Sequence, residues 1–361
     1  MSFSDRDGFI WMDGVEVPWR EANIHILTHS LHYGVAAFEG MRAYETRNGT
    51  AIFRLKEHID RLFKTAHILG MKIPFSPKEI ENASIQSIKS NKLKSAYIRP
   101  LVFYGSEGMG LHANNLSVHV SIASWMWGTY LGEDALTKGI RVKTSSFTRH
   151  MVNSVMCRAK ATGGYINSVM ALQEVAKDGY DEALLLDAEG MVAEGTGENL
   201  FIVKNGELFT PVLTSALEGI TRETIIQLAK NLNLKIKQGE AYNQLFKSHT
   251  NFLQIPLSNV NQSKNHYWVY GLVLKKQNHR DKLMKYLFEN DIQTRQFFWP
   301  LHMQDSLPKK YRSINENLRS TEYIGKNGLY IPIGPHLNLS KQKYVAKQII
   351  NYIDNSIVGK E

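Results

Sequence analysis

The amino-acid sequence predicts an α+β fold with more than one domain. Residues 1–125 alternate short β-rich segments with helical segments. The chain of 361 residues is long enough for two or three domains, each with its own core. The apolar share of 43% and the aromatic share of 10% are typical of globular proteins, so we expect packed domains and not a disordered chain.

The first segment contains two predicted helices and several predicted strands, the first of which ends at Ile52 and Phe53. Apolar residues recur at helical spacing until Gly70, where we expect the first helix to end; they are Ile59, Leu62, Phe63, Ala66 and Leu69. A second helix is expected after Ser76, because Pro77 would occupy its first position and Glu79 follows three residues after the serine. Alternating β-rich residues predict strands at 96–104 and 118–123.

Residues 125–134 mix aromatic, glycine and acidic residues, and we interpret them as a connector to a second domain. The expected elements of that domain are a strand at 139–145, a helix at 166–176, a strand at 183–187 and a helix at 221–232. Asn205-Gly206 lies between short apolar segments and predicts a hairpin. The last helix follows Gly219, so its first backbone amides would be available to bind a phosphate.

The composition changes from about residue 245. Residues 251–265 are rich in Asn, Gln and Ser, which is typical of a crossing between folded units. The expected elements beyond it are a strand at 268–274, a helix at 280–289, an aromatic loop at 297–302, a strand at 329–333 and a closing helix capped by Ser340. We therefore expect a small domain at 1–128, a large domain at 129–245 and a C-terminal subdomain at 246–361.

Several function classes are not expected. The net charge of +9 comes from scattered lysines, which does not favour nucleic acid as a partner. Cys157 is the only cysteine, so an intrachain disulfide is excluded and a reducing, cytoplasmic setting is favoured. We expect no signal peptide and no membrane span. His25, His29 and His32 have no usual metal-ligand spacing, so no metal site is expected.

Lys160 is the residue around which we expect the chemistry to be organised. A lysine taken alone is most often a surface charge, but this one lies in the segment RAKATGGY, whose small residues let a flat ligand approach the backbone. Partial burial would lower its pKa and free the amine to attack a carbonyl. Glu194 opens the glycine-rich segment EGTGEN thirty-four residues later. A lysine with a remote carboxylate is what pyridoxal phosphate requires.

Other candidates each have an ordinary alternative. Tyr97 and Arg99 are two residues apart in a predicted strand and share one face, where they could bind a carboxylate; an ordinary edge-strand arginine is the alternative. Arg61 could bind a phosphate or lie on a helix surface. Four aromatic residues could line an apolar pocket or belong to the core: Tyr33, Phe38, Trp127 and Tyr130.

The order of the motifs is informative where each one alone is weak. Residues 1 to about 240 resemble the branched-chain amino acid aminotransferases, which are fold type IV pyridoxal phosphate enzymes. The segments that carry this resemblance are HSLHYGVAAFEGMRAY, HIDRLFKTA, YIRPLVFYG, GMGL, RAKATGGYINS, DEALLLD, VAEGTGENLF and EGITRETI. The YIRP segment resembles these enzymes and not D-amino acid transaminase or aminodeoxychorismate lyase.

The resemblance implies amino transfer between leucine, isoleucine or valine and 2-oxoglutarate, through a ping-pong cycle on pyridoxal 5'-phosphate. It implies that Lys160 is the catalytic Schiff-base lysine. The implied cofactor-binding residues are Arg61, Lys160, Tyr165, Glu194, Leu217, Gly219, Ile220 and Thr221. The implied substrate-binding residues are Tyr33, Phe38, Gly40, Tyr97, Arg99, Met109, Leu111, Trp127 and Tyr130. Tyr33 and Leu111 would come from a second subunit, so a homo-oligomer is implied.

The C-terminal part departs from this pattern. The family continues with a strand and a GTAAE-like loop that adds phosphate contacts, and we find no such loop here. Residues from about 251 instead resemble the C-terminal subdomain of the DegT-like sugar aminotransferases, through YWVYGLVL, DIQTRQFFWPLHMQ and LYIPIGPHLNLS. The expected architecture is therefore a small α/β domain, a truncated pseudo-barrel domain and an appended α/β subdomain. The alternatives to a branched-chain transaminase are a nucleotide-sugar aminotransferase and an inactive chimeric product.

Overall fold

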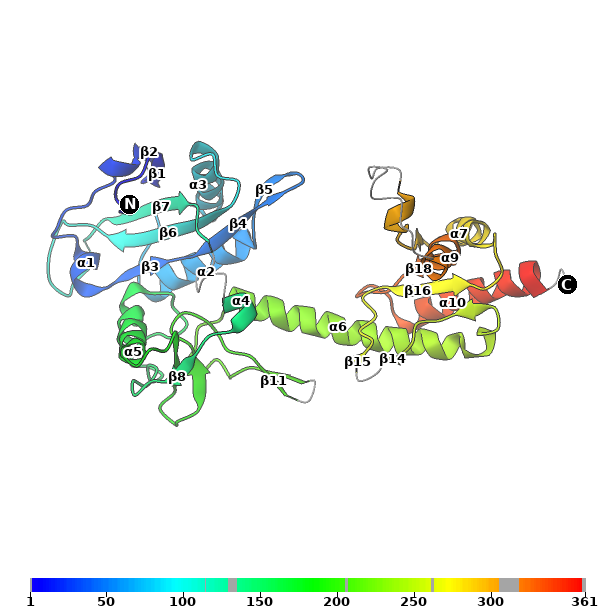
Figure 1. Ribbon diagram of the computed structural model, residues 1–361. Helices are drawn as coiled ribbons and strands as arrows, with labels where there is room; N and C mark the ends of the chain where they lie inside the picture. The colour runs from blue at the N-terminus through cyan, green and yellow to red at the C-terminus, as the bar shows by residue number, and fades with distance from the viewer. Residues whose placement is uncertain are drawn as a thin grey trace. The chain divides into compact units, whose positions relative to one another are not determined.

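The computed structural model describes residues 2–113, 115–128, 135–204, 207–260, 263–304 and 318–358. They belong to two compact units, Met1–Glu223 and Thr224–Glu361, which are considered separately (Figure 1). Among the described residues, every helix is too short or too polar to cross a membrane.

A seven-stranded antiparallel sheet forms the first part of unit 1. Its strands run in the order β2-β1-β7-β6-β4-β5, with β3 also paired to β6. Their bounds are β1 Phe9–Met12, β2 Val15–Pro18, β3 Ala36–Phe38, β4 Met41–Thr46, β5 Gly49–Ile52, β6 Ala96–Tyr104 and β7 Val118–Trp125. The strands predicted at 96–104 and 118–123 are therefore present, and the predicted bounds of β6 agree with the structure. The strand expected to end at Ile52 and Phe53 is β5, which ends at Ile52.

Pro100 explains why β3 and β4 are separate strands. Both pair with β6, β3 with residues 101–103 and β4 with residues 96–98. Pro100 lies between these stretches and has no N–H to donate, so the neighbouring chain leaves the ladder there. Glu39 and Gly40 occupy this interruption, and the Glu39 amide donates to the Pro100 carbonyl at 3.0 Å.

Two long helices of this part pack on the sheet. They are α2 Leu55–Ile68 and α3 Pro77–Ser90, preceded in the chain by the short α1 His29–Tyr33. The expected capping box is confirmed: Ser76 accepts from the Glu79 amide, and Glu79 accepts from the Ser76 amide at 2.7 Å. Apolar side chains of both helices and of the sheet form one extensive core that includes Met41, Ile59, Leu62, Ile80 and Ile98.

Residues 135–223 form a second, smaller arrangement. Its elements are α4 Ala135–Lys138, β8 Val142–Thr144, α5 Tyr165–Lys177, β9 Glu182–Leu186, β10 Val192–Glu194, β11 Ile202–Lys204 and β12 Glu207–Phe209. The strands β10, β9 and β8 make a three-stranded sheet in which β8 and β9 are parallel, and α5 lies in the crossover between them. The predicted hairpin is present as β11 paired with β12; Asn205 and Gly206 lie outside the described residues.

Helix α6, Ile220–Leu245, is longer than expected. The prediction ended this helix at residue 232, which is wrong, because the later turns bury apolar residues that a local pattern does not reveal. Tyr242 and the following Phe246 are fully buried in the core of unit 2. Gly239 is tolerated inside the helix because the Tyr267 ring occupies the position where a Cβ would lie, with its Cγ atom 2.3 Å away.

Unit 2 contains a four-stranded sheet in the order β13-β16-β18-β17 and a small pair, β14 with β15. The bounds are β13 Leu253–Gln254, β14 Asn259–Val260, β15 Ser263–Lys264, β16 Tyr270–Leu274, β17 Arg295–Gln296 and β18 Gly328–Ile331, with helices α7 Arg280–Glu289, α9 Arg319–Asn327 and α10 Leu339–Ile353. The prediction that Ser340 caps the closing helix is wrong. The helix begins at Leu339, two residues earlier than a Ser340 cap requires, and the Asn338 side chain accepts from the Lys341 amide at 2.9 Å.

Candidate active site

Lys160 is held between two elements of the N-terminal sheet part. Its amide donates to the Thr65 hydroxyl on α2 at 3.1 Å, and its carbonyl accepts from the Phe38 amide at the end of β3 at 3.1 Å. An isolated bridge between Ala37 and Ala161 extends this pairing. The backbone of Lys160 is therefore positioned by residues that lie more than ninety positions earlier in the chain.

The glycines that follow Lys160 have a structural reason. The Gly163 amide donates to the Gly34 carbonyl at 2.9 Å, and a Cβ on Gly163 would lie 3.0 Å from that oxygen. Gly34 itself adopts φ +67°, which favours glycine. The sequence suggested that the small residues near Lys160 allow a flat ligand to approach. In the structure, Gly163 instead allows the backbone after Lys160 to approach the backbone at Gly34.

The Lys160 side chain is half-buried, and its amine lies among polar and aromatic groups. Its Nζ donates to the Tyr165 hydroxyl at 2.7 Å and lies 4.8 Å from the centre of the Phe38 ring. Burial lowers the pKa of Lys160 to about 8, although the nearby Glu39 carboxylate opposes this shift. The free amine, which is the nucleophilic form, is thus populated near neutral pH.

Glu194 ends β10 and is buried with three donors around it. The Arg149 Nε donates to one carboxylate oxygen at 2.9 Å, while the Leu217 amide at 3.1 Å and the Asn199 side-chain amide at 3.3 Å donate to the other. Burial raises the pKa of Glu194, and the Arg149 guanidinium and the Leu217 amide oppose this rise. Leu217, expected to contact the cofactor, contacts Glu194 through its amide.

Arg61 lies on α2, and one edge of its guanidinium forms hydrogen bonds with the buried Glu39. Its Nε and Nη2 donate to the Glu39 carboxylate at 2.6 and 2.9 Å, and its Nη1 donates to the Glu218 carbonyl at 2.9 Å. A cavity of about 370 Å³ is lined by Arg61 together with Gly219 and Ile220 at the start of α6. Thr221 is exposed on the first turn of that helix.

Gly219 cannot be replaced by a larger residue without displacing its neighbours. A Cβ at this position would lie 1.9 Å from Oδ1 of Asn199. The Nδ2 group of the same asparagine donates to the Leu217 carbonyl at 3.0 Å. The start of α6 is thereby joined to the loop that carries Glu194. Asn199 therefore contacts three residues expected to bind the cofactor, Glu194, Leu217 and Gly219. No role was assigned to Asn199 from the sequence.

The predicted substrate-binding residues form an aromatic group around Arg99. The Arg99 guanidinium lies 4.8 Å from the centre of the Phe38 ring and donates from Nη2 to the Tyr97 hydroxyl at 2.9 Å. Trp127 packs edge-on against the Tyr97 ring at 4.6 Å. Within the described part of the chain the buried Nε of Arg99 has no hydrogen-bond partner. Gly40 leaves room for Tyr97, since a Cβ there would lie 2.1 Å from the tyrosine hydroxyl.

Tyr33, Met109 and Leu111 form a different group on the surface. The Tyr33 hydroxyl accepts from the Gly110 amide at 3.1 Å, which joins α1 to the 109–111 loop. Leu111 is 87% exposed, and Tyr33 and Met109 are also exposed. Tyr130, the remaining predicted residue, lies outside the described residues.

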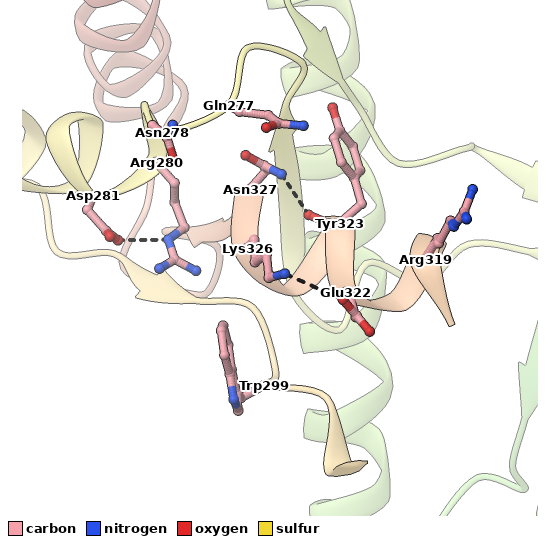
Figure 2. A pocket seen from close by; sticks show the side chains of 10 residues that line it. All are labelled: Gln277, Asn278, Arg280, Asp281, Trp299, Arg319, Glu322, Tyr323, Lys326 and Asn327. Atoms are coloured by element: carbon pink, nitrogen blue, oxygen red, sulfur yellow. Dashed lines mark hydrogen bonds and ion pairs between the residues drawn. The ribbon is translucent and has the colours of Figure 1, made fainter. Parts of the chain in front are cut away.

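Unit 2 has a cavity of its own, of about 450 Å³, shown in Figure 2. Arg280 donates to Asp281 at 2.8 Å, and Lys326 donates to Glu322 at 3.4 Å. Asn327 donates to the Tyr323 carbonyl at 3.0 Å. The first two of these bonds pair charged lining groups with one another, an arrangement typical of structural ion pairs.

The residues of unit 1 fit pyridoxal 5'-phosphate. They provide a buried amine with a lowered pKa at Lys160 and a buried carboxylate at Glu194. Arg61 provides a guanidinium beside the first residues of α6. The unpartnered Arg99 Nε is a donor suited to a carboxylate. Sequence reasoning missed Glu39, Arg149 and Asn199. Of these, Glu39 carried a usable signal, because an acid directly after the apolar run AAF should be paired if it is buried.

Two family models match the chain. The model for amino-transferase class IV matches residues 36–248, and the model for the DegT/DnrJ/EryC1/StrS aminotransferase family matches residues 214–350. The resemblance of the C-terminal part to the second family is thus confirmed.

Known proteins similar to this chain are branched-chain-amino-acid aminotransferases. The Pseudomonas aeruginosa protein is 60% identical over 236 residues, which cover 65% of this chain and 77% of that protein. The Escherichia coli K12 protein is 44% identical over 232 residues, covering 64% and 75%. Among solved structures, the Thermobaculum terrenum enzyme in its PLP-form has a TM-score of 0.57 and 34% identity, covering 62% of this chain and 73% of that one. The chain belongs to the class IV aminotransferases, pyridoxal phosphate enzymes of fold type IV.

Proposed function

We propose that this protein is a branched-chain amino acid transaminase that moves an amino group between leucine, isoleucine or valine and 2-oxoglutarate. The observation that carries the proposal is the buried Lys160 amine, 2.7 Å from the Tyr165 hydroxyl, with a pKa lowered to about 8. The names of the similar proteins from Pseudomonas aeruginosa and Escherichia coli support the choice of substrate.

Pyridoxal phosphate, when bound, supplies a ring that withdraws electrons from the Cα of an attached amino acid. Lys160 would hold the cofactor through Nζ and, once released, move the proton that leaves Cα. Tyr165 is the hydroxyl nearest to that amine and would keep it oriented. Glu194 would bond to the ring nitrogen, and Arg61 with the first amides of α6 would bind the phosphate.

Substrate selection would depend on the group around Arg99. The unpartnered Nε of Arg99 is a donor for the carboxylate that all the amino-acid substrates share, and Tyr97 orients this guanidinium. Phe38 and Trp127 provide apolar surface for a branched side chain. An apolar pocket of this kind separates branched residues from charged ones better than from each other.

The active form would be a homo-oligomer. Tyr33, Met109 and Leu111 form an exposed group that includes large apolar side chains, and we propose that it completes the substrate pocket of a second subunit. The three-part division at residues 128 and 245 is likewise proposed, with the separate sheets of residues 1–128 and 135–223 in its favour. The cytoplasmic setting favoured by the single cysteine stays a prediction.

Replacement of the central lysine tests the function. We expect Lys160→Ala to abolish the visible absorbance band of bound cofactor and to reduce leucine turnover by roughly 10⁴-fold. Lys177→Ala, at the exposed C-terminal end of α5, is the matched control and should leave both unchanged. Retention of the band and of leucine turnover in Lys160→Ala would contradict the proposal.

The pH dependence of cofactor attachment provides a second test. The free amine is the reactive form, and the pKa of Lys160 is about 8, so the reactive fraction increases as pH rises through 8. The rate at which the cofactor-free chain gains the absorbance band should therefore rise with pH and level off above about 8. A rise centred near the ordinary lysine value, about 10.4, would show that the amine is not buried.

A nucleotide-sugar aminotransferase is the second candidate, because the DegT/DnrJ/EryC1/StrS family model matches residues 214–350. Purified protein should be offered 2-oxoisocaproate with glutamate and, separately, keto-sugar nucleotides with glutamate. Turnover of the first substrate alone supports the branched-chain activity. Turnover of the second alone supports the alternative, and turnover of neither supports an inactive chimeric product.

A further inference from the structure

Glu39 is a fully buried carboxylate in an otherwise apolar stretch. Such a group is strongly destabilising unless both oxygens are paired. One oxygen accepts from Arg61 Nε at 2.6 Å, and the other accepts from Arg61 Nη2 at 2.9 Å and from His58 Nδ1 at 2.7 Å. Burial alone would raise the pKa of Glu39, but bonds from His58 and Arg61 outweigh burial and hold it at about 2.

These bonds fix one edge of the Arg61 guanidinium. A guanidinium has five N–H groups, of which Arg61 uses two toward Glu39 and one toward the Glu218 carbonyl. Within the described part of the chain, the other two N–H groups, one on each Nη atom, make no hydrogen bond. His58 and Arg61 lie one turn apart on α2, so the three side chains form a compact unit at one site on that helix.

We propose that Glu39, supported by His58, is a positioning residue that aims the available N–H groups of Arg61 at the phosphate of the cofactor. The inference rests on the proposed cofactor site and goes beyond it, since Glu39 itself touches neither phosphate nor substrate. Arg61 lines the same cavity as Gly219 and Ile220, where the phosphate would lie.

Glu39 could affect phosphate binding through its negative charge or through the orientation it gives Arg61, and these two effects have opposite signs. Its negative charge next to Arg61 weakens the attraction of this site for an anion, so removing the charge should tighten phosphate binding if attraction alone decides. If position decides, removing the carboxylate should weaken binding, because the side chain of glutamine places an N–H₂ donor against a donor of Arg61. Glu39→Gln keeps the volume and separates these two outcomes.

The experiment measures equilibrium binding of pyridoxal 5'-phosphate and of pyridoxal, which lacks the phosphate, to the full chain by fluorescence titration. For Glu39→Gln we expect the dissociation constant of pyridoxal 5'-phosphate to rise at least about tenfold, and that of pyridoxal to change less than about twofold. Glu45→Gln is the matched control, because Glu45 is exposed and its salt bridge among the described residues is to Lys94. It should change neither constant.

Three outcomes overturn the inference. Unchanged or tighter binding of pyridoxal 5'-phosphate by Glu39→Gln would show that Arg61 needs no positioning. Equal weakening for both ligands would show a general structural role. If the wild-type chain binds neither ligand, the proposed function fails along with the inference.

His58→Asn serves if Glu39→Gln does not fold, because it keeps the Glu39–Arg61 pair and removes one support. A selective rise of about threefold for pyridoxal 5'-phosphate is expected. No selective change in this variant would overturn the supporting role of His58 and, with it, the proposed positioning unit.

Discussion

Residues 1–128 and residues 135–223 both contribute to the candidate active site, but they are held together differently. The first region has a seven-stranded sheet, two long helices and an extensive apolar core. The second has a three-stranded sheet, and its apolar cluster is built on four buried residues: Ala171, Val175, Ala183 and Leu185. The buried Glu194 carboxylate adds polar contacts to the second region, because it accepts from Arg149 and from the Leu217 amide.

The difference indicates which region determines the geometry of the site. Lys160 belongs to the second region, yet its backbone bonds to Thr65 and Phe38 of the first. Gly163 contacts Gly34 in the same way. Residues 1–128, which are well packed, thus fix the backbone position of the segment that contains Lys160. Residues 135–223 provide the reactive side chains Lys160 and Glu194. This interpretation predicts how substitutions in each region change stability and hydrogen exchange.

Arg149→Met tests whether polar bonds hold the second region. Arg149 and Glu194 are both almost fully buried, so the substitution leaves a buried carboxylate without its charged partner. We expect the free energy of opening of residues 182–199, measured by hydrogen exchange, to fall by about 3 to 5 kcal/mol. Arg158→Met, in which an exposed arginine is lost, should lower it by less than about 1 kcal/mol.

The same variant should respond to pH in a defined direction. Without Arg149 the pKa of Glu194 should rise further above its unfolded value, because burial already raises it. The folded state then takes up a proton as pH falls toward the ordinary glutamate pKa, so the loss of stability should become smaller. A loss that grows on acidification would contradict the assignment of an unpaired Glu194 carboxylate.

Gly40→Ala tests tight packing in the first region. The added Cβ would lie 2.1 Å from the Tyr97 hydroxyl, so the ring must move and Arg99 loses a contact. We expect a destabilisation of about 1 to 3 kcal/mol and a raised KM for leucine. Gly128→Ala is the control, because an added methyl group there would meet no atom of the described residues within 4 Å. An unchanged KM in Gly40→Ala would show that the position of Tyr97 is not needed.

Hydrogen exchange of the unmodified protein tests directly whether residues 1–128 are more stable than residues 135–223. Amides of β6, in the centre of the large sheet, should exchange on the order of tenfold more slowly than those of β9, in the small one. Mass spectrometry of peptides covering residues 96–104 and 182–186 gives both rates in one sample. Equal protection would mean that the polar contacts of the second region compensate for its small core.

The sequence predicted elements well where the signal was local. The capping box at Ser76 and the alternation of β6 depend on neighbouring residues, and both agree with the structure. The end of α6 was missed because Tyr242 is buried by residues far along the chain, which no local pattern contains. The cap of α10 was misplaced by two residues, because Asn338 and Ser340 are both good caps and only the backbone decides between them.

The candidate site was predicted through its reactive groups and not through their supports. Lys160, Glu194 and Arg61 lie in recognisable motifs, but their roles stay predictions until tested. Arg149 is forty-five residues from Glu194, and a pairing over that separation leaves no trace in a single sequence. Glu39 could have been found, since an ionisable residue in a buried stretch requires a partner.

The anchoring of Lys160 has a consequence for biosynthesis. A ribosome releases residues 1–128 first, and they contain Thr65, Phe38 and Gly34, the groups that receive the Lys160 segment. Residues 1–128 can therefore fold before the reactive lysine emerges. The Lys160 segment can then bond to Thr65 and Phe38 as soon as it emerges, because these residues are already folded. The parts of the site thus assemble in the order in which they are translated.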